Sequence, residues 1–275
     1  MWGSASRLRR AGKSAGSPEA VSWDTRSVAN GAHTLTAIAR DGSGNIASSA
    51  NVAVTVTNSA QPPGLVAAYS FDQASGTSAP DASGSGNTGT LTNGAVFSPS
   101  GGKYGGAVSF DGQNDSVTVA DSASLDLTSG MTLEAWVRPA TTGWPYRTVL
   151  MKEQSGNLAY ALYLSDATRP LTTAITGGIE RIAQAPTALR ANTWVHLAST
   201  YDGANMRLYV NGTLVTTTAA TGSITVSTGA LRIGANSIWT EEAFAGLVDE
   251  VRVYNRALTA AEVTSDMNVP LGTAD

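Results

Sequence analysis

Apolar and polar residues alternate with a period of two along much of the chain, which is the pattern of half-buried β-strands. Within residues 19–58, the stretches AHTLTAIARD and ANVAVTVTN show this alternation on either side of DGSGN, a run of turn-forming residues. The pattern predicts a β-hairpin that forms part of a β-sandwich. Residues 1–18 are small, polar and basic without any periodicity, so we expect a disordered tail there.

The two prolines of SAQPPG interrupt the alternation and predict a linker over residues 59–63. Many short alternating runs, separated by Gly, Asn, Asp and Ser, follow over residues 64–270. They predict an all-β domain, a two-sheet antiparallel sandwich of the jelly-roll type. Asn211 and Gly212 predict a two-residue hairpin turn. Thr259 and Glu262 have the spacing of a capping box at the start of one short helical turn.

Charge and composition exclude several classes of function. The formal net charge is -4 and the only basic cluster, RLRRAGK, lies in the tail, so we expect no nucleic-acid-binding surface. The absence of cysteine excludes disulfides and thiolate metal sites, and the two histidines, His33 and His196, fall in different predicted domains. No apolar run is long enough to cross a bilayer. These features leave the oligomeric state open.

Five phrases carry a resemblance to a known family: GLVAAYSFDQASGTSAPDASGSGNTGTL, GGAVSFDGQNDSVTVADSASLDL, MTLEAWVRP, NTWVHLASTYDGANMRLYVNG and FAGLVDEVRVYNRALTAAEV. Over nearly all of residues 64–265 the chain resembles the laminin-G-like, or concanavalin A-like, jelly-roll domains of bacterial secreted proteins. Residues 19–58 resemble the C-terminal part of a bacterial immunoglobulin-like domain. The resemblance implies an extracellular module that binds a polysaccharide or cell-surface glycan, with its secretion signal upstream or missing. Function does not follow from the fold, because the same fold carries lectins, hydrolases and lyases.

A metal site is suggested by Asp81 and Asn87 in the loop DASGSGN and by Asp249 in the last strand. Carboxylates and loop carbonyls are the oxygen ligands that Ca²⁺ prefers. The resemblance implies a structural calcium, held by these three residues, that ties the loop to the last strand. The alternative is that Asp81 closes an Asx-turn and Asp249 caps the backbone or pairs with an arginine such as Arg252 or Arg256.

Strict alternation within GLVDEVRVYN predicts that the two adjacent acids of that strand, Asp249 and Glu250, point to opposite faces of the sheet. It places Asp249 on an apolar face with Val251, where a cation would offset the cost of burying a carboxylate. It places Glu250 beside Arg252 on a polar face, as an ordinary surface or groove acid.

Aromatic residues in loops are candidates for stacking on sugar rings. The loop TTGWPYR contains Trp144, Tyr146 and Arg147, and the loop NSIWTEE contains Trp239. We expect these four side chains to bind the ligand. The acids and amides of the second loop, Asn236, Glu241 and Glu242 among them, have residue types that suit a metal, but their spacing favours a solvated loop.

Strand periodicity predicts where the other aromatic side chains lie. Trp136 and Trp194 lie inside alternating stretches and are expected in the core. Tyr160 and Tyr163 differ by three positions and therefore point to opposite faces of their sheet, so at most one can reach a ligand.

A glycan-active enzyme, either a glycoside hydrolase or a polysaccharide lyase acting on the concave face, is the alternative function. A retaining glycosidase needs two carboxyls about 5 to 5.5 Å apart, but Glu134 has no acidic neighbour two or four residues away and is expected to pair with Arg138. His196 could act as a proton-transfer group of a lyase, although a hydrogen-bonded strand histidine is the simpler interpretation. We therefore expect a calcium-stabilised, lectin-like binding module.

Overall fold

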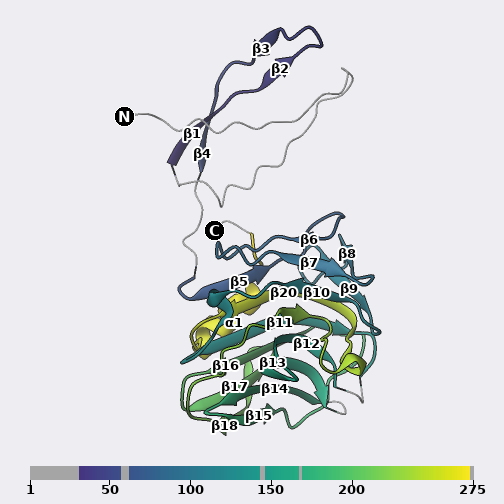
Figure 1. The fold of residues 1–275 in the computed structure, drawn as a ribbon, viewed down its shortest axis with the longest axis vertical. Helices are drawn as coiled ribbons and strands as arrows, with labels where there is room; N and C mark the ends of the chain where they lie inside the picture. Colours follow the sequence, from purple (N-terminus) through teal and green to yellow (C-terminus); the bar gives the residue numbers. More distant parts are fainter. Residues whose placement is uncertain (1–30, 57–61, 143–145, 167–168, 273–275) are drawn as a thin grey trace. The chain divides into compact units, whose positions relative to one another are not determined.

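The computed structural model describes residues 31–56, 62–142, 146–166 and 169–272. The chain divides into two compact units, Met1–Ala60 with Ala274–Asp275, and Gln61–Thr273. Figure 1 labels strands of both units and the helix of the second.

The first unit contains the hairpin that the alternation predicted. β1 (Gly31–Leu35) pairs with β4 (Val52–Val56), and β2 (Ile38–Arg40) pairs with β3 (Ile46–Ser48). Asp41 orders the loop between β2 and β3, since its Oδ1 accepts hydrogen bonds at 2.9 Å from the backbone N–H groups of both Ser43 and Asn45. A ribbon of this kind does not establish an immunoglobulin-like sandwich, which stays a prediction.

Two antiparallel sheets build the second unit and confirm the predicted jelly-roll sandwich (Figure 1). The strands of sheet 1 are β6 (Ser78–Ala79), β7 (Gly89–Thr92), β10 (Ser116–Val119), β12 (Thr148–Gln154), β13 (Asn157–Asp166), β14 (Arg169–Thr176), β15 (Ile179–Gln184) and β19 (Leu231–Ile233). Those of sheet 2 are β5 (Leu65–Tyr69), β8 (Val96–Ser98), β9 (Ala107–Asp111), β11 (Met131–Pro139), β16 (Val195–Tyr201), β17 (Asn205–Val210), β18 (Thr213–Ala219) and β20 (Ala245–Tyr254).

The strand order fixes which side chains share a surface. Sheet 1 runs β15-β14-β13-β12-β19-β10-β7-β6, and sheet 2 runs β18-β17-β16-β11-β20-β9-β8 with β5 also paired to β20. Short 3-10 turns occur at Ala123–Leu125 and Thr240–Glu242. The β17–β18 hairpin turns at Asn211 and Gly212, whose φ angles of 50° and 74° confirm the predicted two-residue turn.

The hydrophobic core lies between the facing sides of the two sheets. Leu133 of β11, Leu162 of β13 and Val251 of β20 are fully buried there. Tyr160 points into this core, whereas Tyr163 lies in a separate apolar cluster on the outer face of sheet 1. The opposite orientation predicted for the two tyrosines is therefore confirmed, and Tyr163 is the one on the outer face.

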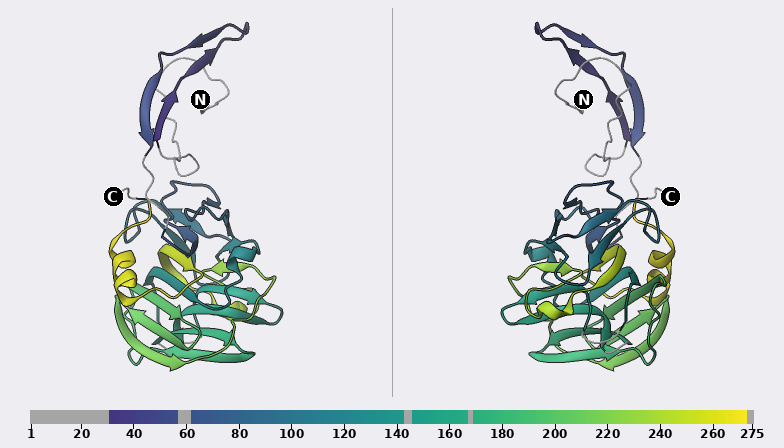
Figure 2. Two further views of the ribbon diagram at one scale, coloured as in Figure 1. Left: turned by 90° about the vertical axis from the view of Figure 1, so that its left-hand side faces the viewer. Right: turned by 90° about the vertical axis from the view of Figure 1, so that its right-hand side faces the viewer.

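Helix α1 (Ala260–Asn268) covers part of the outer face of sheet 2 (Figure 2). The predicted capping box is present: the Thr259 hydroxyl accepts from the Glu262 N–H, and the Glu262 carboxylate accepts from the Thr259 N–H at 2.7 Å. The helix is longer than the single turn expected, because Val263 packs into a cluster with Tyr254 and Ala198. No helix in the described ranges is long and apolar enough to cross a membrane.

The strict alternation predicted for β20 is wrong, because the strand contains a β-bulge. Glu134 of β11 lies opposite Arg252, yet Trp136, two residues on, lies opposite Asp249, so β20 carries one extra residue. Glu250 supplies it, with a φ of 53°. Asp249 consequently does not share the core-facing side of Val251, and Glu250 is a buried partner of Arg252 at 2.9 Å rather than a surface acid.

Several other expectations for sheet 2 are wrong, in part because helix α1 covers some of its outer face. Trp136 is buried, but on the outer face: its indole Nε1 donates to the Met267 carbonyl at 3.2 Å, and its ring packs on His196 at 5.4 Å. His196 is not a hydrogen-bonded histidine within the described chain, since neither ring nitrogen has a partner there. Burial, together with nearby Arg252, lowers the pKa of His196 to about 3. Trp194 lies before β16 and is only half-buried.

The expected pairing of Glu134 with Arg138 is also wrong. Glu134 is fully buried opposite Arg252, while Arg138 is exposed and its Nε donates to the Asn192 carbonyl at 3.4 Å. Alternation did place Glu134 and Arg138 on one face, but α1 covers only the part of that face that contains Glu134.

Candidate functional site

A depression on the outer face of sheet 1, about 250 Å³ in volume, brings together aromatic and polar side chains from five segments of the chain. We call it the aromatic pocket. Its lining residues are Tyr146, Asn157, Leu158, Tyr163, Leu171, Thr173, Glu180, Ile182, Trp239 and Glu242. The floor is formed by β13, β14 and β15, where Ala161, Thr173 and Ile182 lie side by side on adjacent strands.

Three aromatic side chains give the pocket its apolar surface. The ring centroids of Tyr146 and Tyr163 are 5.4 Å apart with the planes inclined at 62°, an edge-to-face arrangement. Tyr146 and Trp239 are half-buried and pack against the apolar cluster that contains Tyr163 and Leu158. Tyr146 and Trp239 are therefore each supported on one side by the protein, and their exposed remainder can contact a ligand, whereas Tyr163 is buried.

Glu242 holds two walls of the pocket together. Its Oε2 accepts a hydrogen bond from the Tyr163 hydroxyl at 3.1 Å and another from Asn236 Nδ2 at 3.0 Å. Only 8 % of Glu242 is exposed, and this burial raises the pKa of its carboxyl. The expectation that Glu242 lies in a solvated loop is wrong, because the turn at Thr240–Glu242 directs its side chain onto β13.

Asn236 positions Trp239 through the backbone of the loop after β19. Its Oδ1 accepts from the N–H groups of Ile238 at 3.0 Å and Trp239 at 2.6 Å, while its Nδ2 also donates to Thr148 Oγ1 at 2.9 Å. This is an Asx-turn, which fixes the local backbone of the residues that it spans. The backbone that carries Trp239 is thereby held in place, which lowers the ordering cost of binding a ligand there.

The four ligand-binding residues predicted from the sequence have three different outcomes. Tyr146 and Trp239 line the same pocket, although they are separated by more than ninety positions in the sequence. Arg147 does not line it: its Nη1 donates to the Ala243 carbonyl at 2.8 Å and so ties β12 to the loop that carries Trp239. Trp144 lies outside the described residues.

The predicted calcium ligands Asp81 and Asn87 contact each other through a hydrogen bond of 2.9 Å from the Asn87 N–H to Asp81 Oδ2. Asp81 also accepts hydrogen bonds from the N–H groups of Ala68 and Ser83 and from the Ser83 hydroxyl. These donors occupy the carboxylate oxygens that a cation would need, so the Asp81 side chain does not fit a calcium ligand as folded. Its contacts favour the Asx-turn alternative.

Asp249, the third predicted calcium ligand, contacts the backbone of Tyr104 instead. Its Oδ2 accepts from the Tyr104 N–H at 3.0 Å, its Oδ1 has no partner among the described residues, and burial raises its pKa to about 8. Neither Arg252 nor Arg256 pairs with it, since these arginines bind Glu250 and Glu262. The described residues contain no group of three or more His, Cys, Asp or Glu side chains that could hold a metal ion. Calcium binding through Asp81, Asn87 and Asp249 stays a prediction of the resemblance.

Residues that the sequence did not single out complete the pocket. Glu180 lies on its rim and accepts from the Thr173 hydroxyl at 2.9 Å, while Asn157 begins β13. Their side chains lie on the outer face because of the strand register, which is visible only after β13, β14 and β15 are paired. The available sequence signal was the opposite orientation of Tyr160 and Tyr163, which predicted that at most one of them could lie on this face.

Comparisons with known proteins agree with the jelly-roll fold. Residues 110–264, more than half of the chain, match the family model of the concanavalin A-like lectin/glucanases superfamily. Mouse pappalysin-1 is 35% identical over 79 residues, which are 27% of this chain and only 5% of pappalysin-1.

Solved structures with a similar fold include domain 4 of AbnA, a GH43 extracellular arabinanase from Geobacillus stearothermophilus, in complex with arabinotriose. It is 22% identical with a TM-score of 0.55, and the match covers 74% of this chain and 98% of that domain. The binding domain of Paraclostridial Mosquitocidal Protein 1 is 17% identical with a TM-score of 0.59, covering 74% of this chain and 52% of that one. The receptor-binding domain of botulinum neurotoxin type G is 15% identical with a TM-score of 0.57, with coverages of 74% and 51%. At these identities the structures share the fold. From the family match, the chain belongs to the concanavalin A-like lectin/glucanase superfamily.

Proposed function

We propose that the protein is a carbohydrate-binding module that holds a polysaccharide or cell-surface glycan in the aromatic pocket. The observation that carries this proposal is the convergence of Tyr146, Tyr163 and Trp239 in one depression. Sugar rings present apolar C–H faces and polar hydroxyl edges, so a binding site needs both aromatic surface and hydrogen-bonding groups. Thr173 and Glu180 supply such groups beside the aromatic rings.

The structural relatives support this class of ligand. One of them is a domain of an extracellular arabinanase bound to arabinotriose, which shows that the shared fold can hold a neutral oligosaccharide. The same relative, with the resemblance of the sequence to modules of secreted proteins, supports an extracellular location for this chain as part of the proposal. The structural calcium that the resemblance implies is not part of this proposal, because both carboxylate oxygens of Asp81 already accept hydrogen bonds from the protein; chelation tests it separately.

A glycan-active enzyme is the second candidate, because two carboxyl groups, those of Glu180 and Glu242, line the aromatic pocket. Paired carboxyls are the machinery of glycoside hydrolysis. Against this role, each carboxylate already accepts a hydrogen bond from the protein, Glu180 from Thr173 and Glu242 from Tyr163. The lyase alternative through His196 loses its support, since that side chain is fully buried on the outer side of sheet 2 beneath Trp136 and α1.

A polysaccharide panel tests the proposal directly. The full chain is run through affinity gels that contain arabinan, xylan, β-glucan, galactan or pectin, and the same mixtures are assayed for new reducing ends and unsaturated products. Retention without products supports a binding module. Product formation would instead support the glycan-active enzyme. The absence of both retention and products across the panel would overturn the proposal.

Substitutions of the aromatic residues test whether the glycan binds in the aromatic pocket. Trp239→Ala and Tyr146→Ala should each weaken retention by about 1 to 3 kcal/mol, since truncation of a buried aromatic anchor has this cost at interfaces. Trp194→Ala is the matched control, because it removes a half-buried tryptophan that does not line the pocket. Equal affinity of all three variants and the unaltered protein would place the glycan elsewhere.

A further inference from the structure

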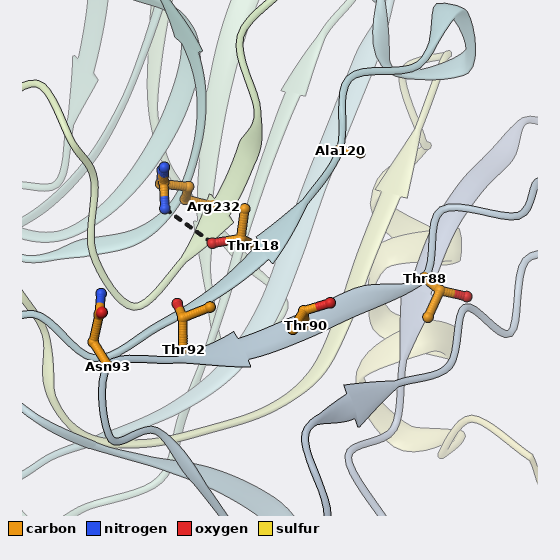
Figure 3. A pocket seen from close by; sticks show the side chains of 7 residues that line it. All are labelled: Thr88, Thr90, Thr92, Asn93, Thr118, Ala120 and Arg232. Carbon is orange, nitrogen blue, oxygen red and sulfur yellow. Dashed lines mark hydrogen bonds between the residues drawn. The ribbon is translucent and has the colours of Figure 1, made fainter.

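A second depression lies on the same outer face of sheet 1, with a volume of about 490 Å³. Thr88, Thr90 and Thr92 follow one another along β7 and the residue before it, and Asn93 ends the row (Figure 3). Thr118 of β10 and Arg232 of β19 form the opposite side. We call this the threonine groove, and in contrast to the aromatic pocket it has no aromatic lining residue among those described.

Hydroxyl groups in the threonine groove are available to a ligand. Thr88 and Thr90 are exposed, and neither hydroxyl has a partner within the described chain. Residues two apart on a strand lie about 7 Å apart on one face, so the row offers hydrogen-bonding groups at regular intervals. Thr118 Oγ1 accepts from Arg232 Nη1 at 2.9 Å and keeps its own proton free to donate. A surface of this type suits a chain of hydroxyl-bearing units.

The charge of the groove favours a neutral ligand. Arg232 is the only charged residue among the described lining residues, and its Nε lies 2.9 Å from Oε1 of Glu153, which is largely buried. The guanidinium is thus compensated by a fixed carboxylate and held rigidly, leaving N–H donors that can serve a sugar hydroxyl. A second basic residue, as an anionic polymer would require, does not line the groove.

Glu153 also connects the threonine groove to the aromatic pocket. The carboxylate oxygen that faces Arg232 accepts a hydrogen bond at 2.5 Å from the N–H of Ser237, two residues before Trp239. The wall of one depression is therefore joined to the wall of the other through one side chain. In the strand order only β12 separates β13, which lines the pocket, from β19, which lines the groove, so these two strands lie about 10 Å apart.

We propose that the threonine groove binds further units of the same neutral polysaccharide chain that the aromatic pocket holds. This inference rests on the proposed function and extends it: stacking in the pocket provides the primary contact, and hydroxyl contacts in the groove make binding depend on chain length. From β15 to β7 the surface crosses six strand spacings, or about 29 Å, so an oligosaccharide of several units is needed to reach both depressions. Occupying both raises affinity because the second contact is intramolecular.

Calorimetric titration with two fragments of the retained polysaccharide, its trisaccharide and its hexasaccharide, tests the groove. The double variant Thr88→Val and Thr90→Val removes two hydroxyls while keeping side-chain shape. Thr217→Val is the matched control, an exposed threonine on β18 of the other sheet. For the unaltered protein and the control, we expect the hexasaccharide to bind about tenfold or more tightly than the trisaccharide. In the double variant that advantage should disappear, with trisaccharide affinity unchanged.

The outcomes separate the groove from the pocket. Equal affinity of the two fragments for the unaltered protein would overturn the groove proposal and leave the aromatic pocket as the complete site. A length advantage that survives in the double variant would also overturn it, by placing the additional contact elsewhere. If neither fragment bound, the proposed function itself would fail, and the groove proposal with it.

Discussion

Removal of the Glu242 side chain should damage both the stability of the jelly roll and its binding site. The Glu242 carboxylate is 8 % exposed and accepts hydrogen bonds from Tyr163 and Asn236. Glu242→Ala leaves the tyrosine hydroxyl without this acceptor and deprives Asn236 of one of its two side-chain partners. Because Asn236 also holds the backbone of Trp239, the change reaches two aromatic walls of the pocket.

The size of the effect follows from those two contacts. A hydrogen bond to a charged group contributes about 1.5 to 3 kcal/mol. Distances of 3.1 and 3.0 Å are long for such bonds, so we take the lower figure for each and expect a loss of about 3 kcal/mol in the free energy of unfolding. For a unit of this size that corresponds to a fall of roughly 6 to 12 °C in Tm. Glycan affinity should fall at least about tenfold, equivalent to about 1.4 kcal/mol.

Urea denaturation and affinity-gel retention measure the two consequences. Glu241→Ala is the matched control, because Glu241 is the same residue type, adjacent in the chain and exposed; its effect on stability should stay within about 0.5 kcal/mol. Glu242→Gln retains one acceptor oxygen and should recover most of the stability and binding lost in the alanine variant. If Glu242→Ala and Glu241→Ala unfold at the same urea concentration and bind equally well, the assignment of Glu242 as the organiser of the pocket is refuted.

Three further predictions concern the loop between β6 and β7, sheet 2 and helix α1. Because the Asp81 carboxylate is occupied by N–H and O–H donors, we expect EDTA to leave Tm unchanged; a fall that Ca²⁺ reverses and that Asp249→Asn abolishes would instead establish the calcium site. Burial holds the pKa of Glu134 well above its ordinary value of 4.5, so the native state keeps a proton that the unfolded chain releases, and stability should decline as the pH rises above 4.5. Glu134→Gln should flatten that decline in urea titrations at a series of pH values, and an unchanged slope would contradict the assignment. Thr259→Ala should cost about 1 kcal/mol by removing the cap of α1, which an unaltered urea midpoint would disprove.

The sequence predicted the fold well because its evidence is local and repeated. Many strands of the sandwich have their own alternation, and Asn211 with Gly212 or Thr259 with Glu262 specify a turn and a helix start within a few residues. Packing of the two sheets then follows from the apolar faces, since the apolar side chains must be removed from water. The described residues of the second unit show no departure from this two-sheet architecture.

The candidate site was only partly predictable, because it depends on contacts between distant segments. Tyr146 and Trp239 could be selected as loop aromatics, but nothing local indicates that the turn at Thr240–Glu242 directs Glu242 to Tyr163. Arg147 had the residue type of a ligand contact and instead stabilises a loop carbonyl. Residue type identified candidates, whereas the pairing of strands and loops decided which of them meet.

The adjacent acids Asp249 and Glu250 show where a period-two argument fails and what the failure implies. Alternation assumes that each residue of β20 has one partner on β11, but the bulge places two residues against one and brings both acids to the outer side. A positive φ at Glu250 is uncommon for a non-glycine residue and costs of order 1 to 3 kcal/mol. Hydrogen bonds from Arg252 and from the Leu271 N–H to its carboxylate oppose that cost. Because these partners lie on the strand and on the segment that follows α1, the bulge and the docking of the C-terminal segment stabilise each other. Any ligand of Asp249 must therefore approach from the side covered by α1, away from the core between the sheets.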